Sequence, residues 1–325
     1  MPDKKKVVAL IPNEHVKLEI LASASRFADM VYVGTDKEAE LALPNANALF
    51  LWDVSTRVIR DNPHWVNLEW IHTASIGVDA ILSEEVVSSD VVVTHTRGVF
   101  ERPIAEYVLG LLIAITKEFY PTYRYQQAEE WVPRSTRSIA GQTVVIVGPG
   151  AIGREIHQML SAVGYNLIVV GRNNVERDDT FGRVYSIDKF SEILPTADAV
   201  ILAMPLTAQT RNFMDGPRFS LLKPGATFIN IGRGGLVDEV ALMHALEQGR
   251  VGTAALDVFV TEPLPKGHPF WKMEQVIVSP HMSSDLHDYP VAAAKLFLSN
   301  LERWANGQPL ENIVDKRKLA SGGVK

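Results

Sequence analysis

Three glycines, Gly148, Gly150 and Gly153, stand at G-x-G-x-x-G spacing in the segment QTVVIVGPGAIGREIHQML. The segment runs from an apolar stretch typical of a buried strand into an apolar pattern of helical period. In that context the first glycine permits a tight turn, the second lets the backbone approach a pyrophosphate, and the third lets the helix pack on the sheet. The helix N-terminus then faces the anion. We predict a dinucleotide site formed by Gly148, Gly150, Ala151, Ile152 and Gly153.

The residues after the next apolar run indicate which nicotinamide cofactor fits. An NAD site normally carries Asp or Glu about 20 residues after the glycines, where the carboxylate holds the ribose 2′-hydroxyl. Here the run LIVV is followed by Gly171, Arg172 and Asn173. Without an acid there is no repulsion of a 2′-phosphate, and a guanidinium forms a charge-assisted contact with one. We therefore expect NADP(H) to be preferred over NAD(H), with a solvated surface arginine as the alternative interpretation of Arg172.

Three other segments place polar side chains directly after predicted buried strands. Arg233 lies in the glycine-rich segment INIGRGGLVDE, and Asp257 and Glu262 lie in ALDVFVTEPLP. His281 follows a strand and a proline in VIVSPHMSSD. Ligands of open α/β sheets bind beyond the carboxyl ends of the strands, so a cation, a carboxylate and an imidazole at such ends can converge. Taken singly, these residues also have a structural interpretation as a surface arginine, a turn glutamate or a capping histidine.

Short β-branched runs that alternate with helical patterns are expected to position these residues. Apolar runs this short are typical of parallel strands covered on both faces. The predicted strands lie at 7–11, 48–52, 91–93, 144–147, 167–170, 199–203, 227–231, 253–256 and 276–278. Helices are predicted from Ile152 to Val163, from the N-cap Asp238 to Gly249, and from Val291 to about Asn306. The predicted fold class is α/β, with doubly wound parallel sheets of the Rossmann or flavodoxin type.

The composition excludes several kinds of chemistry. Of 325 residues, 46% are hydrophobic and 22% charged, which favours a folded protein over a disordered chain. The net charge is −6 and no segment concentrates enough basic residues to bind a phosphate backbone, so we expect no nucleic-acid partner. The absence of cysteine excludes disulfides and thiolate sites and fits a cytoplasmic location. The apolar run 107–115 is about half of the roughly 20 residues that cross a bilayer, so we expect a buried helix, no membrane partner and no secretory signal.

Two segments interrupt the regular patterns and divide the chain. Proline, glycine, serine and charged residues cluster around Arg97–Pro103 and again around Ser279–Pro290. The interval between them carries its own series of strands and helices, and the length also suggests two domains of about 100–200 residues each. We predict a middle domain over 101–284, inserted into a first domain formed by 1–100 and 285–325.

Taken together, these segments resemble the D-isomer-specific 2-hydroxyacid dehydrogenase family, in particular its glyoxylate and hydroxypyruvate reductases. The resemblance covers nearly the whole chain through the order and spacing of HTASIGVDAI, PIAEYVLGLLIAI, GPGAIG, MPLTAQT, INIGRGGLVDE, LDVFVTEPLP and SPH. It implies that domain 101–284 binds the dinucleotide, that domain 1–100 with 285–325 binds the substrate, and that two copies form a homodimer. After His281 the chain reads MSSD, where the family more often has alanine and glycine.

The resemblance also assigns roles to residues. It implies that Arg233 binds the substrate carboxylate and polarises the ketone, that His281 donates a proton to the carbonyl oxygen, and that Glu262 keeps His281 protonated. A 2-keto acid carries one negative charge and a carbonyl oxygen that gains charge during reduction, which fits a cation beside a proton donor. The resemblance implies that no metal takes part. Further matches assign the backbone amides of Ser75, Ile76 and Gly77 to the substrate, and Ala203, Pro205, Thr210, Ile231, Gly232 and Asp257 to the cofactor.

The implied activity is the NAD(P)H-dependent reduction of a small 2-keto acid to the D-2-hydroxy acid. Glyoxylate or hydroxypyruvate is the first expectation for the substrate, and a branched 2-keto acid is the next. A phosphoglycerate-type dehydrogenase stays open, as does an NAD(P)-sensing binding protein of the same fold, which needs the glycines but no working catalytic residues. Trp131 either covers the substrate pocket of a neighbouring subunit, as a tryptophan does in some relatives, or anchors an interface.

Overall fold

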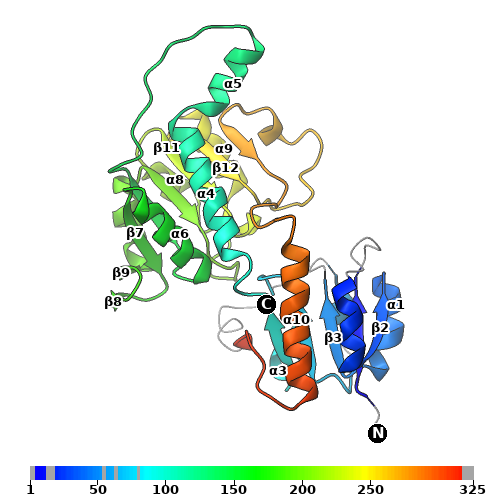
Figure 1. Cartoon of the computed structure of the whole chain (residues 1–325). Coiled ribbons are helices and arrows are strands. Elements are labelled where there is room, and N and C mark those ends of the chain that lie inside the picture. Colours follow the sequence, from blue (N-terminus) through cyan, green and yellow to red (C-terminus); the bar gives the residue numbers. More distant parts are fainter. Residues whose placement is uncertain (1–3, 12–18, 53–55, 62–64, 79–80, 317–325) are drawn as a thin grey trace. The chain divides into compact units, whose positions relative to one another are not determined.

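The chain forms two compact units (Figure 1). The structure is a computed structural model that describes residues 4–11, 19–52, 56–61, 65–78 and 81–316. Unit 1 comprises Met1–Phe100 and Leu286–Lys325, and unit 2 comprises Glu101–Asp285. Unit 2 is thus inserted into unit 1, and the second boundary lies one residue later than the sequence predicted.

Unit 1 contains a five-stranded parallel sheet in the order β2-β1-β3-β4-β5, which is the order of flavodoxin-like doubly wound sheets. The strands are β1 (Lys6–Leu10), β2 (Asp29–Val33), β3 (Ala48–Leu51), β4 (Trp70–Thr73) and β5 (Val92–His95). The helices are α1 (Asp36–Ala42), α2 (Val58–Asp61), α3 (Glu84–Ser88) and α10 (Tyr289–Ala305). Helix α10 returns the chain to unit 1, where the buried ring of Phe297 stacks on Phe50 with ring centroids 4.1 Å apart. The predicted strands and the predicted last helix of this unit are confirmed, whereas β2 and β4 were not predicted.

Unit 2 contains an eight-stranded sheet in the order β13-β12-β11-β10-β6-β7-β9-β8. The strands are β6 (Thr143–Val147), β7 (Asn166–Gly171), β8 (Val175–Asp178), β9 (Gly182–Ser186), β10 (Ala199–Leu202), β11 (Ala226–Asn230), β12 (Val251–Leu256) and β13 (Val276–Val278). All neighbours are parallel except β8 and β9, which form an antiparallel hairpin at one edge. The chain runs outward from β6 through β7 and β9, then returns to β10 on the other side of β6. The point between β6 and β10 is therefore the topological switch point, where open α/β sheets bind their ligands.

The helices of unit 2 are α4 (Glu101–Thr116), α5 (Phe119–Gln127), α6 (Ala151–Ala162), α7 (Phe190–Ile193), α8 (Gly216–Ser220) and α9 (Glu239–Glu247). Three of them, α4, α6 and α9, lie where the sequence predicted helices, whereas α5, α7 and α8 were not predicted. Helices α4 and α6 lie side by side (Figure 1). The side chain of Asp238 caps α9 by accepting the Ala241 N–H at 3.0 Å, and Gly249 follows the helix with φ +68°. Among the described residues, no helix has both the length and the apolar character that crossing a bilayer requires.

Candidate functional site

In the glycine turn between β6 and α6, the first and last glycines have no room for a side chain, whereas the middle glycine faces open space. A Cβ on Gly148, whose φ is +124°, would lie 2.4 Å from the Ala203 carbonyl oxygen, and a Cβ on Gly153 would lie 2.0 Å from the Gly148 carbonyl oxygen. Neither position can accept a side chain. A Cβ on Gly150 would meet no heavy atom within 4 Å. Helix α6 begins at Ala151, so its first amides belong to this turn, and the turn fits a dinucleotide pyrophosphate.

The predicted adenosine end lies where β7 ends. A Cβ on Gly171 would lie 2.7 Å from Pro149 Cγ, which excludes an acidic side chain at that position in this backbone. Arg172 and Asn173 follow and are exposed. Arg154, on the first turn of α6, is already engaged because both of its terminal nitrogens donate to the Asp178 carboxylate at 2.7 Å. Arg172 and Asn173 are therefore placed at the end of the strand that a ribose approaches in this fold.

Five other predicted cofactor residues follow the neighbouring strands β10 and β11: Ala203, Pro205 and Thr210 come after β10, and Ile231 and Gly232 come after β11. The Ala203 N–H donates to the Val147 carbonyl at 2.9 Å, and the Ile231 N–H donates to the Leu202 carbonyl at 3.2 Å. These bonds extend the parallel ladder past the strand ends. Thr210 then closes the loop after β10, because its hydroxyl donates to the Pro205 carbonyl at 2.9 Å.

The structure brings together the three residues predicted to be catalytic, which come from the segments after β11, β12 and β13. His281 Nδ1–H donates to Glu262 Oε2 at 2.8 Å. Glu262 Oε1 accepts the Phe259 N–H at 2.9 Å, so both carboxylate oxygens are held. The Arg233 guanidinium is close enough for its charge to act on Glu262 and on His281.

The hydrogen bond between His281 and Glu262 sets the protonation of both groups. The bond and the charge of Glu262 raise the pKa of His281 above its ordinary value, against the opposing effects of burial and of Arg233. For Glu262, burial alone would raise the pKa, but the bonds from His281 and Phe259 and the charges of His281 and Arg233 lower it. The two shifts favour the form of the pair in which an imidazolium lies beside a carboxylate, and this is the form that can donate a proton.

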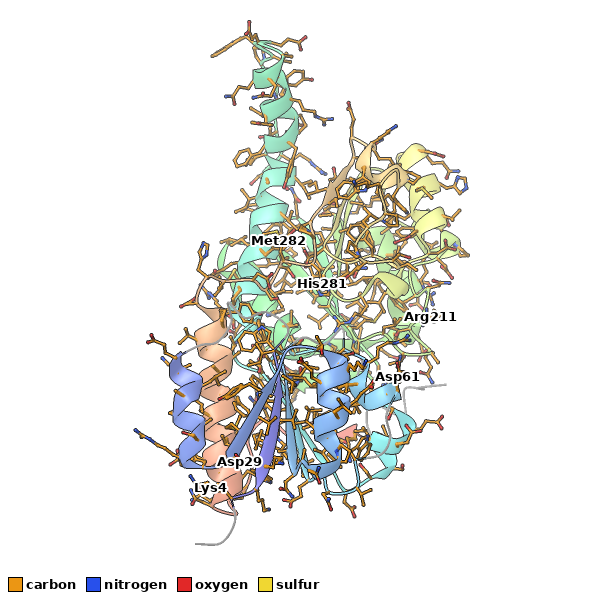
Figure 2. The ribbon with its side chains drawn as sticks, turned by 90° about the vertical axis from the view of Figure 1, so that its right-hand side faces the viewer. Lys4, Asp29, Asp61, Arg211, His281 and Met282 are labelled. Carbon is orange, nitrogen blue, oxygen red and sulfur yellow. The ribbon has the colours of Figure 1, made fainter. Side chains whose placement is uncertain are left out.

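A buried carboxylate, Asp257, positions the turn that carries His281. Figure 2 labels His281 and Met282 in this turn. Asp257, which is 1% exposed, accepts the backbone N–H groups of Met282 at 2.9 Å and Ser283 at 3.0 Å. Between these anchors and β13, His281 adopts a left-handed φ of +54°, which is uncommon for a residue other than glycine. Asp257 also accepts the Ser279 hydroxyl at 2.7 Å, and Ser279 in turn accepts the Tyr107 hydroxyl. Asp257 therefore anchors this turn, a role that the sequence did not predict, and its contact with the cofactor stays a prediction.

The side chain of Asn230 anchors the turn that carries Arg233, as Asp257 anchors the turn that carries His281. This residue ends β11 and is fully enclosed; its side-chain amide donates to the Arg233 carbonyl at 2.9 Å and accepts the Gly232 N–H at 3.1 Å. The sequence signal was a polar residue at the end of an otherwise apolar strand, ATFIN. It was missed because one buried asparagine has many structural explanations.

Comparisons with known proteins identify the family. The family model described as D-isomer specific 2-hydroxyacid dehydrogenase, NAD binding domain, matches residues 109–283, which is more than half of the chain. A glyoxylate reductase from Thermofilum pendens is 32% identical over 262 residues, covering 78% of this chain and 76% of that protein. The chain belongs to the D-isomer specific 2-hydroxyacid dehydrogenase family.

Solved structures of this dehydrogenase family share the fold of both units. An NADPH-dependent glyoxylate/hydroxypyruvate reductase from Sinorhizobium meliloti, in complex with NADP and sulfate, has a TM-score of 0.84 at 25% identity, covering 97% of this chain and 99% of that one. A family member from Xanthobacter autotrophicus, in complex with NADPH and MES, has a TM-score of 0.79 at 26% identity, with the same coverage. The predicted fold class and the predicted oxidoreductase activity of a nicotinamide-dependent 2-hydroxyacid dehydrogenase are confirmed.

The residues predicted to bind the substrate carboxylate through their amides belong to unit 1 of the dehydrogenase. The Ser75 N–H donates to Thr73 Oγ1 at 3.2 Å, and the Gly77 N–H donates to Ser75 Oγ at 3.1 Å. The Ile76 carbonyl is bonded to His95 Nδ1 at 2.9 Å. Two of the three predicted amide donors are thus engaged within the loop, and their contact with substrate stays a prediction.

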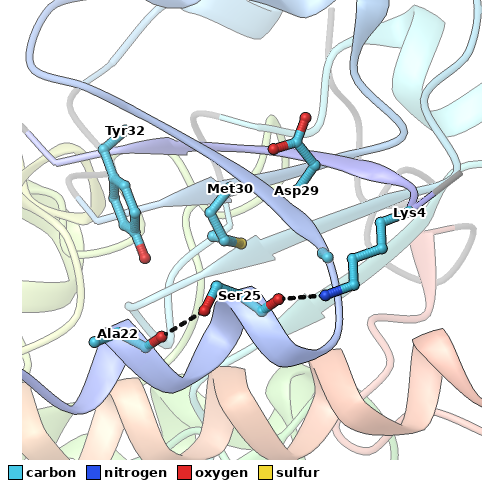
Figure 3. Close-up of a pocket in the computed structure, with 7 residues that line it drawn as sticks. Lys4, Ala22, Ser25, Asp29, Met30 and Tyr32 are labelled. Carbon is cyan, nitrogen blue, oxygen red and sulfur yellow. Dashed lines mark hydrogen bonds between the residues drawn. The ribbon is translucent and has the colours of Figure 1, made fainter.

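A surface cavity of about 720 Å³ lies beside the edge strand β2 in unit 1 (Figure 3). Lys4, Ser25 and Tyr32 are among its lining residues, and Lys4 Nζ donates to the Ser25 carbonyl at 2.7 Å. None of the predicted site residues of the dehydrogenase lines it.

Within the described ranges, no group of three or more His, Asp or Glu residues is placed to hold a metal ion.

Proposed function

We propose that this dehydrogenase reduces a small 2-keto acid to the D-2-hydroxy acid, with glyoxylate or hydroxypyruvate as first substrates and NADPH as the preferred reductant. The observation that carries the proposal is the His281–Glu262 hydrogen bond of 2.8 Å beside Arg233. It supplies a proton donor and a cation, the two groups that a ketone next to a carboxylate requires as it is reduced.

Each side chain has a distinct task in this mechanism. The Arg233 guanidinium binds the substrate carboxylate and attracts electron density toward the ketone oxygen. His281 uses Nδ1 for Glu262, so the proton that goes to the ketone oxygen comes from Nε2. Glu262 stabilises the imidazolium before transfer. The Gly148–Gly153 turn would hold the pyrophosphate of the reduced cofactor, which when bound would supply the hydride to the carbonyl carbon.

Turnover tests this proposal directly. NADPH absorbance decay is followed with glyoxylate, hydroxypyruvate, a branched 2-keto acid and 3-phosphohydroxypyruvate. We expect the highest kcat/KM with glyoxylate or hydroxypyruvate. The highest value with 3-phosphohydroxypyruvate would favour a phosphoglycerate-type dehydrogenase, and binding of NADPH without turnover of any acid would favour a cofactor sensor.

The preference for NADPH depends on Arg172. The two relatives solved with NADP or NADPH support it, as does the exposed position of Arg172 at the end of β7. Because a hydrogen bond to a charged group contributes about 1.5–3 kcal/mol, Arg172→Ala should lower the ratio of kcat/KM for NADPH over NADH by roughly tenfold or more. Arg177→Ala, which removes an exposed arginine from β8, serves as the control. A wild-type preference for NADH would contradict the proposal.

We also propose that the enzyme is a cytoplasmic homodimer. The support for association is the exposed aromatic side chains Phe119 and Tyr123 on α5, together with Trp131, which is 95% exposed. Size-exclusion chromatography with light scattering tests the dimer, and Trp131→Ala distinguishes an interface anchor, whose loss weakens association, from a pocket cover, whose loss raises KM.

A further inference from the structure

The loop that carries Glu262 lies directly against the turn that carries Arg233. A Cβ on Gly234 would lie 1.9 Å from the Phe259 carbonyl carbon and 2.3 Å from the Val260 nitrogen. The two backbones are therefore in contact without any intervening side chain. Because the Phe259 N–H also holds Glu262 Oε1, the position of this backbone decides where the Glu262 carboxylate lies.

A second carboxylate, Glu239, holds the same loop from the first residue of α9. Glu239 Oε1 accepts the Val260 N–H at 3.0 Å, and Oε2 lies 3.8 Å from His268 Nε2. The Glu239 and His268 side chains are only 21% and 20% exposed. His268 Nδ1 accepts the Phe270 N–H, so the proton of the neutral ring is on Nε2, toward Glu239. Glu239 is thus bonded to the loop and lies next to His268.

We propose that Glu239 is a positioning residue for the proton-donating pair, and this rests on the proposed function of His281. The successive amides of Phe259 and Val260 donate to two different carboxylates, Glu262 and Glu239. By holding the Val260 N–H, Glu239 fixes the peptide plane that follows Phe259. The Phe259 N–H belongs to the preceding peptide plane, which is joined to the fixed plane at Phe259 Cα, so fixing one plane limits how far the other can turn away from Glu262. Glu262 Oε1 then accepts from Phe259, and Oε2 accepts from His281.

Glu239 acts on His281 by holding the loop in position and not through its own charge. The groups whose charges act on His281 are Glu262, Arg233 and Asp257. A variant that keeps an acceptor oxygen in place of Glu239 but carries no charge should therefore preserve the pair, whereas a variant without an acceptor should not. Comparing these two variants therefore distinguishes a positioning role of Glu239 from a long-range electrostatic effect of its charge on His281.

The experiment compares three variants with the wild type. Glu239→Ala removes the acceptor, Glu239→Gln retains one, and Glu247→Ala removes an acid from the other end of α9, where the side chain is 66% exposed. NMR titration of His281 in the full chain without substrate gives the pKa of the imidazole. The pH profile of kcat/KM for keto-acid reduction and the Kd of NADPH are measured alongside.

In Glu239→Ala we expect the pKa of His281 to fall toward its ordinary value, and kcat to fall roughly tenfold as the donor loses alignment. The Kd of NADPH should stay within about twofold, because the glycine turn is untouched. Glu239→Gln and Glu247→Ala should behave as the wild type.

Three results would show whether the positioning role of Glu239 or the proposed function is wrong. An unchanged His281 pKa in Glu239→Ala, with only a lower Tm, would overturn the proposal and leave a structural role. A Glu239→Gln variant that is as impaired as Glu239→Ala would also contradict it. If the pKa falls as expected while even the wild type reduces no 2-keto acid, the positioning role stands and the proposed function fails.

Discussion

Two histidines, one in each unit, show how the surroundings of an imidazole decide what it does. His281 in unit 2 is half exposed and donates to Glu262, which raises its pKa. His72 in unit 1 is 0% exposed, and burial together with the charge of His95 lowers its pKa to about 3. The surroundings therefore favour the charged imidazole at His281 and the neutral imidazole at His72.

The contacts of His72 fit a neutral ring. Thr96 donates its hydroxyl proton to the Thr73 carbonyl at 2.9 Å, so it can only accept from His72 Nε2. Thr94 accepts the Trp70 indole N–H at 2.8 Å, and its own proton is directed at His72 Nδ1, 2.7 Å away. Every polar atom of the ring is paired without a charge.

The difference teaches that the bond and charge of a carboxylate outweigh partial burial at His281. At His72, full burial and the charge of a second imidazole act together to disfavour the charged ring. The rings of Phe50, Trp70 and Phe297 lie within 6 Å of the His72 ring, measured between centroids. None of these rings can stabilise an imidazolium as Glu262 does at His281. Only the charged histidine suits proton donation near neutral pH.

The largest expected effect comes from removing the charged histidine. His281→Ala should lower kcat for keto-acid reduction by roughly 10²- to 10⁴-fold, because the proton donor is lost. The Kd of NADPH should change by less than about threefold, since the Gly148–Gly153 turn is intact. Steady-state kinetics and fluorescence titration measure the two quantities. Unchanged turnover would remove His281 from the mechanism.

The next effect concerns the partner that keeps His281 charged. Glu262→Gln keeps the shape of the side chain and removes its charge, so the pKa of His281 falls. Reduction needs the protonated ring, and kcat/KM declines as pH rises through the pKa; the midpoint of this decline should therefore move to lower pH. At pH 8 the loss should be roughly tenfold to a hundredfold, and it should shrink as pH falls. A loss that is equal at every pH would indicate that Glu262 acts in another way.

The smallest effect comes from the neutral histidine and concerns stability. The native state keeps His72 neutral down to about pH 3, whereas the unfolded chain takes up a proton below about 6.5. The free energy of unfolding should therefore fall as pH falls below 6.5, by up to roughly 1.4 kcal/mol per pH unit from this group. His72→Phe should flatten that slope, although it also lowers stability at every pH because Thr94 and Thr96 each lose their hydrogen bond with His72. Urea unfolding between pH 5 and 7 measures the slope, with the exposed His244→Gln as control, and an unaltered slope would show that His72 is charged in the native state.

Local patterns were enough to predict the elements that present the site. The glycine turn, α6 and the strands ending near Arg233 and His281 combine apolar periodicity with residues that only a few backbone geometries accept. Strands β2 and β4 and the hairpin β8–β9 were not predicted, because polar residues such as those of VERD in β8 interrupt the apolar runs.

The contacts that hold the catalytic residues could not be predicted from local sequence patterns. The roles of Arg233, Glu262 and His281 came from the family resemblance rather than from spacing. The bond between Tyr107 and Ser279 joins residues 172 positions apart, and no periodicity signals such a pair. Asp257 was assigned to the cofactor, and its bonds to the His281 turn became evident only in the folded chain.

The most direct test of the account is an NMR titration of the histidines in the wild-type enzyme and in Glu262→Gln. We predict that His281 in the wild type titrates above 6.5, that its pKa falls in Glu262→Gln, and that His72 stays neutral down to about pH 3 in both proteins. A wild-type His281 that titrates at or below 6.5 and does not respond to the loss of the Glu262 charge would contradict the claim that this pair is the proton donor.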